Sequence, residues 1–181
     1  MKNWIAGACV VALTGLLVAA ELESGLKVGD APGPYNVKDV TGPSAGKSLC
    51  YRCQYGQRPV VNIFTRSVTP ELGALVKEVD GIVGKNGDKK MAAFVTVLAE
   101  DADKLSPQLK EMAEKAGIKN VPLTIFDGSS GPPDYKIAKD ADVTVLMWSK
   151  SEVKANFALE KGKLDGAQTK AIVAATDKIL N

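Results

Sequence analysis

Histidine is absent from this chain of 181 residues, and cysteine occurs only three times, as Cys9, Cys50 and Cys53. Without histidine, general acid–base chemistry would fall to carboxylates, lysine or tyrosine. A zinc site built from two thiolates would lack the histidine that commonly completes it. The missing Cys-His step also excludes covalent attachment of a c-type haem.

An excess of charge of one sign is missing as well. The net charge is +2, and basic and acidic residues are interspersed. Without a basic cluster, neither nucleic acid nor a membrane surface is an expected partner. Residues 42–48 imitate a phosphate-binding loop but are one residue short of its pattern, so no cofactor is expected. The sequence leaves the oligomeric state open.

The first 20 residues have the features of a secretory signal. Lys2 gives a short positive start, an apolar run covers residues 5–18, and small residues follow at the cleavage point. About 15 apolar residues is short for a membrane span, although retention as an N-terminal anchor stays open. We predict export to the periplasm or the extracellular space. Cleavage removes Cys9 and leaves the other two cysteines in an oxidising compartment that favours a disulfide.

Strands and helices alternate through the rest of the chain. Residues 21–34 are predicted to form an N-terminal extension, and residues 35–181 a single domain large enough for a full core. The expected elements are a hairpin between residues 37 and 49, strands 60–65, 91–98 and 122–126, helices 70–83 and 106–116, a loop 128–141, a second hairpin with strands 143–148 and 153–159, and a last helix 166–180. This order predicts an α/β fold with a parallel core and an antiparallel edge.

The order of elements resembles that of the thioredoxin-like superfamily over about residues 35–180. Within it the chain is most similar to peroxiredoxins. Residues 114–118, 121–127 and 135–137 resemble a peroxiredoxin helix, a strand that starts at proline and ends at aspartate, and a tyrosine-containing turn. A competing alignment treats Val121-Pro122 as the cis-proline dipeptide of thioredoxin, but it leaves residues 128–148 without a place.

The residues that would give a peroxiredoxin its activity do not match. The resemblance implies a reactive cysteine after a Thr-Pro step at a helix start, where the helix dipole stabilises a thiolate. Here Leu72 occupies about that position, and residues 140–142 stand where an activating arginine is expected. Ser67 and Thr69 lie at this site without an evident base, and Thr69 is expected to cap the helix. Peroxidase activity is therefore not expected.

The Cys-x-x-Cys motif precedes the strand 60–65, whereas the redox site of the superfamily follows it. Six residues of strand span roughly 20 Å. We therefore expect Cys50 and Cys53 at the opposite end of this strand from Thr69, or on the rim beside it. Residues 54–59 do not resemble a helix start, so no helix dipole is expected to act on the thiols.

Three interpretations of the pair stay open. Lys47, Arg52 and Arg58 put positive charge near the thiols, which lowers the thiol pKa and favours a redox-active dithiol. A two-residue spacer also tends to give a labile disulfide. The alternatives are a static disulfide that fixes the hairpin exit, worth about 2 kcal/mol or less for so short a loop, and half of a metal site that lacks further ligands.

We predict an exported thioredoxin-like protein that uses Cys50 and Cys53 as a thiol–disulfide redox site, with another thiol or disulfide protein as its partner. The alternative is a non-enzymatic scaffold or binding module on the same fold, with a structural disulfide. No metal ligands are predicted. Whether the pair is catalytic or structural cannot be decided from the motif alone.

Overall fold

The computed structural model describes residues 22–181. The predicted secretory signal, residues 1–20, lies outside this part of the chain, and Cys9 lies outside it too. Among residues 22–181, no helix is both long enough and apolar enough to cross a membrane.

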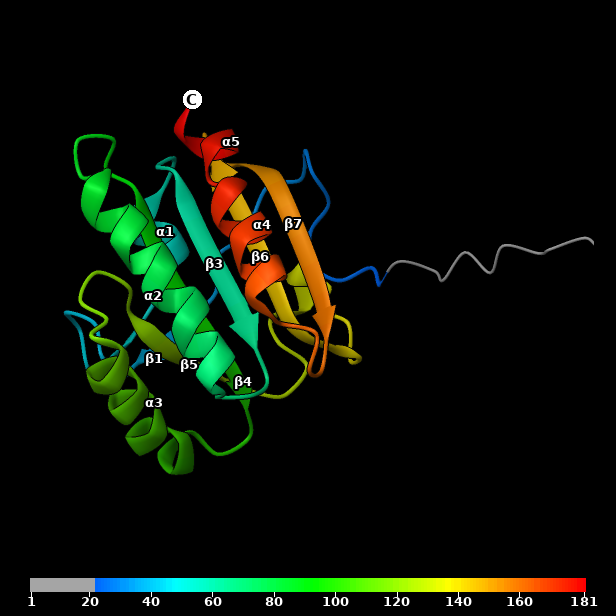
Figure 1. Cartoon of the computed structure of the whole chain (residues 1–181). Coiled ribbons are helices and arrows are strands. Elements are labelled where there is room, and N and C mark those ends of the chain that lie inside the picture. The colour runs from blue at the N-terminus through cyan, green and yellow to red at the C-terminus, as the bar shows by residue number, and fades with distance from the viewer. Residues whose placement is uncertain (1–21) are drawn as a thin grey trace, which may run out of the picture.

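Seven strands of the described residues form one mixed sheet in the order β2-β1-β5-β4-β3-β6-β7. The three middle strands, β5, β4 and β3, are parallel, and every other pairing is antiparallel. The strands are β1 (Val37–Asp39), β2 (Ser48–Leu49), β3 (Val60–Thr65), β4 (Ala92–Ala99), β5 (Leu123–Asp127), β6 (Ala141–Ser149) and β7 (Glu152–Glu160). The parallel centre with an antiparallel edge confirms the predicted α/β fold (Figure 1).

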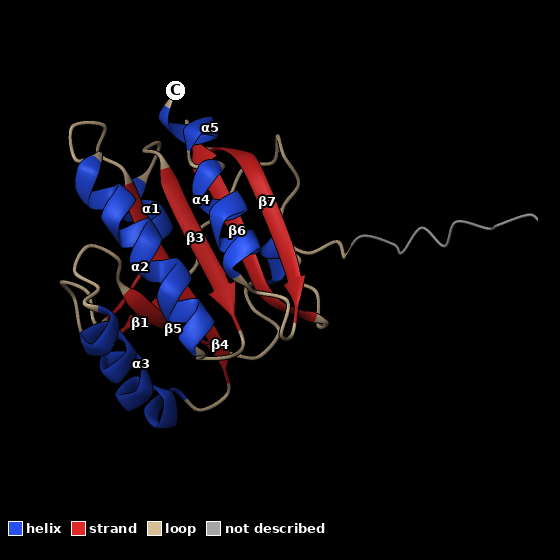
Figure 2. Cartoon of the chain, in the orientation of Figure 1, coloured by secondary structure: helices blue, strands red, loops and turns tan. Residues whose placement is uncertain are grey.

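The two faces of the sheet are covered differently (Figure 2). One face carries α2 (Pro70–Lys85), α3 (Ala102–Ala116), α4 (Gly166–Ala174) and α5 (Asp177–Leu180). The other face carries α1 (Tyr51–Tyr55), the 3-10 turn Pro133–Tyr135 and the N-terminal segment, residues 22–36. Alternate side chains of β3 therefore enter two separate cores.

The start of α2 was predicted correctly, and the start of α3 was not. The side chain of Thr69 accepts a hydrogen bond from the N–H of Leu72 at 3.2 Å, which caps α2 as expected. Helix α3 begins at Ala102 rather than at Ser106, because the Asp101 carboxylate caps it by accepting from the N–H of Lys104 at 3.3 Å. The proline of the predicted start therefore lies inside the helix.

The end of the chain forms two helices where one was predicted. Helix α4 ends at Ala174, and α5 begins at Asp177. Between them the hydroxyl of Thr176 donates to the carbonyl of Val173 at 2.7 Å, and the Thr176 N–H donates to the same carbonyl at 3.1 Å. These bonds tighten the last turn of α4 and interrupt the regular helical pattern.

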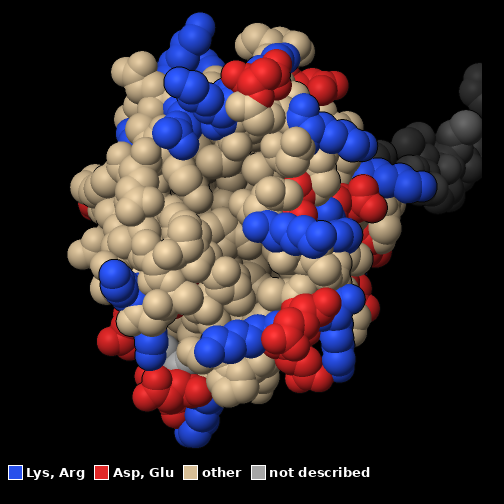
Figure 3. Space-filling view, turned by 90° about the vertical axis from the view of Figure 1, so that its left-hand side faces the viewer, with Lys and Arg blue, Asp and Glu red and all other residues tan. Residues whose placement is uncertain are grey.

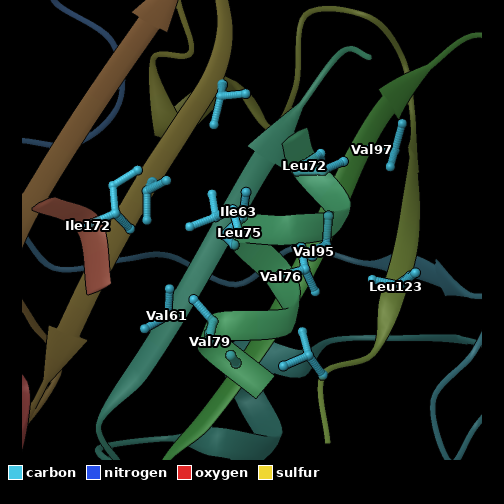
Figure 4. Close-up of a cluster of buried hydrophobic side chains, with 14 of the residues drawn as sticks. Val61, Ile63, Leu72, Leu75, Val76, Val79, Val95, Val97, Leu123 and Ile172 are labelled. Atoms are coloured by element: carbon cyan, nitrogen blue, oxygen red, sulfur yellow. The ribbon is translucent and has the colours of Figure 1, made fainter. Parts of the chain in front are cut away.

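An aliphatic core lies between the sheet and α2 to α5. Leu72 and Leu75 of α2 are fully buried against the odd-numbered side chains of β3. Figure 4 shows this packing, with labels on Val61, Ile63, Leu72, Leu75, Val76, Val79, Val95, Val97, Leu123 and Ile172. The helical spacing of the α2 residues predicted this apolar stripe, and burial of each such side chain stabilises the fold by about 1.5–3 kcal/mol.

A second core, rich in aromatic side chains, lies on the opposite face. The Tyr35 ring, from the N-terminal segment, packs against Tyr135 with ring centroids 4.9 Å apart. A buried polar group lies within this core, where the Asn62 amide donates to the Tyr35 hydroxyl at 2.6 Å. The Tyr35 hydroxyl also lies 3.0 Å from the Thr96 hydroxyl. Burial, chiefly, raises the pKa of Tyr35, so its hydroxyl stays protonated in this network.

Charged residues are mixed on the face of the molecule that Figure 3 shows. Basic side chains lie next to acidic ones there, beside a broad area that carries neither. Lys38 pairs with Asp103 at 2.9 Å, and Lys104 pairs with Asp101 at 2.8 Å. These pairs are exposed and contribute little to stability.

Candidate dithiol site

Cys50 and Cys53 form a disulfide, with their Cα atoms 5.2 Å apart. Cys50 is the N-cap of α1, and its Sγ accepts a hydrogen bond from the N–H of Cys53 at 3.0 Å. The predicted disulfide is therefore present. Residues 54–59 do not start a helix, as expected, but a helix that the sequence did not predict begins inside the motif, at Tyr51. Its five residues are too few for the periodicity of the sequence to reveal it.

The disulfide lies at the end of β3 that the sequence predicted. Residues 56–59 join α1 directly to the first residue of β3. The carbonyl of Gln57 accepts from the N–H of Lys150 at 2.8 Å, which places this loop beside the turn between β6 and β7. Thr69 and α2 follow the other end of the strand. Figure 1 accordingly shows α1 near the beginning of β3.

Tyr51 fastens α1 to the N-terminal hairpin. Its side chain is 2% exposed, and its hydroxyl donates to the Asp39 carboxyl at 2.8 Å. The same carboxyl accepts the N–H groups of Gly42 and Ser44, each at 2.8 Å. Burial and then the Asp39 carboxyl raise the pKa of Tyr51 well above its usual range, so Tyr51 remains a hydrogen-bond donor. The residue next to Cys50 is thus a fixed point of the fold.

Arg52, between the two cysteines, is held by three segments of the chain. Its Nε donates to the carbonyl of Pro32 at 2.9 Å, and its Nη1 donates to the carbonyl of Gly56 at 3.3 Å. Its Nη2 donates to the hydroxyl of Ser151, in the β6–β7 turn, at 3.2 Å. The guanidinium therefore anchors α1 to the N-terminal segment and to the turn between β6 and β7.

The two sulfur-bearing residues differ in exposure. Cys53 is exposed, and so is the following Gln54. Cys50 is only partly exposed and lies between Leu49, which packs against the aromatic core, and the buried Tyr51. Lys47 and Arg58 are both exposed. Of the two residues, Cys53 is thus the more exposed to solvent.

At the other end of β3, the position of the peroxiredoxin nucleophile is fully buried. Leu72 is 0% exposed in the aliphatic core. The hydroxyl of Ser67 donates to the Asp142 carboxylate at 2.7 Å. No base for Ser67 was evident from the sequence, because Asp142 reaches it only through the antiparallel pairing of β3 with β6, in which Thr65 lies opposite Val143. The register of that pairing is the signal that was missed.

Arg66 supplies no free positive charge to this end of the strand. Its guanidinium donates to the backbone carbonyls of Ala141 and Ala138, each at 3.0 Å, and to that of Ser129. These contacts hold the loop that precedes β6. A serine–carboxylate pair with no histidine and no free arginine is a poor nucleophilic site.

The cis-proline feature of the competing thioredoxin alignment is absent from the described residues. The peptide bond between Val121 and Pro122 is trans, since the described residues contain no cis peptide bond. The segment that this alignment could not place is ordered, and the Tyr135 hydroxyl in it donates to the carbonyl of Gly33 at 2.6 Å. The described residues also contain no group of three or more His, Cys, Asp or Glu side chains that could hold a metal ion.

No protein-family model matches the chain, and no curated protein sequence matches it. Solved structures do. A candidate thiol:disulfide interchange protein, DsbE, from Chlorobium tepidum has a TM-score of 0.66 and 11% identity over 86% of this chain and 99% of its own. A candidate protein disulfide isomerase from Bacteroides thetaiotaomicron has a TM-score of 0.64 and 13% identity over 88% and 94%. Peroxidoxin BcpB from Mycobacterium tuberculosis has a TM-score of 0.58 and 16% identity over 85% and 98%.

The chain has a thioredoxin-like fold, as its sequence predicted. Its structural neighbours include proteins named for disulfide exchange and proteins named as peroxiredoxins. At such low identity the likeness concerns the fold alone. Evidence for the function of Cys50 and Cys53 therefore comes from the contacts and exposure of the two residues themselves.

Proposed function

We propose that this protein is an exported thiol–disulfide exchange protein and that Cys50 and Cys53 are its redox pair. The observation that carries the proposal is an exposed Cys53 in a disulfide on a helix that Tyr51 and Arg52 hold in place. Exchange requires a thiolate to reach one sulfur of the disulfide, so exposure is the first condition. A fixed helix keeps both sulfurs close enough to re-form the bond.

The reaction moves two electrons between two pairs of sulfur atoms. A substrate dithiol becomes a disulfide, and the Cys50–Cys53 disulfide becomes two thiols; the reverse reaction oxidises the protein. The substrate is a protein or small molecule that presents a thiol or disulfide at its surface. No metal or organic cofactor takes part in this exchange.

Export is part of the proposal, and its support comes from the sequence. The features of residues 1–20 match those of a cleaved signal, and a disulfide is stable outside the reducing cytosol. N-terminal sequencing of protein recovered outside the cytosol tests this: we expect a start near residue 21. Recovery of the uncleaved chain in the cytosol would contradict it.

A redox titration tests the exchange itself. We expect dithiothreitol and glutathione to reduce the native pair reversibly, with a reduction potential above about −300 mV, the range of labile disulfides. The variant in which both cysteines are replaced by serine should show no exchange. Ser67→Ala, at the other end of β3, should exchange as the wild type does. A potential well below about −300 mV, or exchange that survives loss of both cysteines, contradicts the proposal.

The second candidate function is a scaffold or binding module with a structural disulfide. The burial of Leu72, at the position of the peroxiredoxin nucleophile, favours it, because that end of β3 offers no cysteine. A partner complex that forms equally well with both cysteines replaced by serine would support it. Peroxidase activity is not proposed, and a peroxide-consumption assay with a dithiol reductant should show none.

A further inference from the structure

The two cysteines of the disulfide have different surroundings, and this difference bears on which of the two sulfurs a substrate thiolate attacks. Cys53 is exposed, next to the exposed Gln54. Cys50 is partly covered, and its Sγ accepts the N–H of Cys53 at 3.0 Å. A disulfide is attacked at the sulfur that a thiolate can reach, and it breaks toward the sulfur that better carries negative charge.

We infer that Cys53, the second cysteine of the motif, is the sulfur that forms the mixed disulfide with the substrate, and that Cys50 is the leaving and resolving thiol. This assignment rests on the proposed exchange function and names the catalytic residue within it. It depends on the exposure of the two residues and on the hydrogen bond to Cys50, and not on the order of the cysteines in the sequence.

The exchange proceeds in two balanced steps. A substrate thiolate attacks the Sγ of Cys53 and forms a new S–S bond to it. The bond between the two protein sulfurs breaks, and its electron pair leaves on the Sγ of Cys50 as a thiolate. A second substrate thiolate then attacks the substrate sulfur of the mixed disulfide and expels Cys53 as a thiolate. The substrate loses two electrons as its disulfide forms, and the two protein thiolates take up protons from water.

Two contacts favour Cys50 as the leaving group. The N–H of Cys53 already points at the Cys50 sulfur, and a hydrogen bond to a thiolate is stronger than one to a neutral sulfur. The Tyr51 hydroxyl anchors the backbone next to Cys50 to Asp39, so Cys50 can stay in position while Cys53 carries the substrate. In the reverse reaction Cys50 is then placed to attack the mixed disulfide on Cys53.

Peptide mapping tests the assignment directly. The chain is used in a Cys9→Ser background, so that residues 1–20 contribute no thiol whether or not they are removed. The oxidised protein is mixed with excess glutathione, acid-quenched at short times, blocked with N-ethylmaleimide and digested with trypsin. Cleavage after Arg52 separates the two cysteines onto different peptides. At the earliest times we expect at least tenfold more glutathione on Cys53 than on Cys50.

Single variants give a second measurement that does not depend on the life of the mixed disulfide. At pH 9.5, where both thiols are largely ionised, reduced Cys50→Ser, which keeps the exposed Cys53 thiol, should react with glutathione disulfide at least tenfold faster than reduced Cys53→Ser, which keeps the partly covered Cys50 thiol. Urea midpoints of both variants show that each is folded.

The outcomes separate the assignment from the proposed function. Equal labelling of the two cysteines, or labelling mainly on Cys50, overturns the assignment and leaves the exchange function standing. If glutathione and dithiothreitol fail to reduce the native disulfide at all, this contradicts both the proposed exchange function and the assignment of Cys53 as the attacked sulfur.

Discussion

On the face of the sheet covered by α2 to α5 the buried side chains are aliphatic, whereas the face covered by α1 and the N-terminal segment is rich in aromatic ones. The first turn of α2, with Thr69 as its cap and Leu72 in the aliphatic core, lies on the aliphatic face. The resemblance to peroxiredoxins implies a reactive cysteine there. The aromatic face carries the disulfide that the chain does have. The redox motif and the expected position of redox chemistry thus lie on opposite faces of one sheet and at opposite ends of one strand.

A familiar fold and a familiar motif therefore do not have to coincide at a site. On the aliphatic face, Leu72 is an ordinary core side chain that contributes by burial. The aromatic face is held by directed contacts, such as those of Tyr51 and Arg52, that fix the position of the disulfide. Five experiments test this difference between the two faces.

Alkaline pH should have the largest effect of the five experiments, and it should act through the tyrosines of the chain. Burial, chiefly, raises the pKa of all four tyrosines of the chain above the usual value near 10. Above pH 10 the unfolded state therefore loses tyrosine protons that the folded state keeps, and stability falls as pH rises. At pH 11 each such tyrosine costs about 1.4 kcal/mol. Urea unfolding between pH 8 and pH 11.5 measures the loss.

A matched variant and a spectrum check the cause. Tyr55→Phe should reduce the fall between pH 10 and pH 11 by the contribution of one tyrosine. Absorbance at 295 nm should show no tyrosinate until the protein unfolds. A tyrosinate signal with a midpoint near pH 10 in the folded protein would contradict the explanation.

Leu72→Ala should give the next largest effect, on the aliphatic face. It removes a fully buried side chain and leaves a cavity, at a cost of about 3 kcal/mol in the free energy of unfolding. The rate of thiol exchange at Cys53 should not change, because the two residues lie on opposite faces. Val28→Ala, at a side chain that is 64% exposed, is the control and should cost little. A loss below about 1 kcal/mol at Leu72 would show that this end of the fold is not closely packed.

Most of the fold could be predicted from the sequence because its signals are local. The apolar stripe from Leu72 to Val83, the cap at Thr69 and the helix stop at Gly117 each depend on residues a few positions apart. Asp101 shows the limit of such signals. It competes with Ser106-Pro107 as a helix start, and only the observed hydrogen bond decides between them.

The site could be predicted only in part, because its contacts join distant segments. The disulfide followed from the spacing of its cysteines and the expected export. The bonds of Arg52 to Pro32 and Ser151 span 20 and 99 positions, and no local pattern predicts them. The difference in exposure between Cys50 and Cys53 depends on the helix turn between them, which is too short to show a period.

Reduction of the disulfide should cost less than loss of Leu72. The bond closes a loop of sequence separation 3, so its contribution from loop entropy is about 2 kcal/mol. Urea unfolding with and without dithiothreitol, in the Cys9→Ser background, measures this. The variant with serine at both Cys50 and Cys53 is the control, and added reductant should not change its stability. A loss much above about 3 kcal/mol would favour the structural role over the redox one.

Tyr51→Phe should cost about 1.5 kcal/mol, because it removes a buried hydrogen bond to Asp39 and keeps the ring in the aromatic core. The Asp39 carboxyl retains the two backbone N–H groups of the hairpin, so the fold should survive. Looser anchoring of α1 should also shift the reduction potential of the disulfide. An unchanged potential together with the lost stability would show that Tyr51 supports the fold and does not position the cysteines.

Ser67→Ala is the counterpart of Tyr51→Phe on the other face and should have the smallest effect. It removes the hydrogen bond to Asp142, but both groups are partly exposed and water can replace the lost partner. We expect a loss of about 0.5 kcal/mol and no change in the exchange rate or the reduction potential. A large fall in exchange would instead link this end of β3 to the disulfide. The independence of the disulfide from the Ser67 end of β3 would then be wrong.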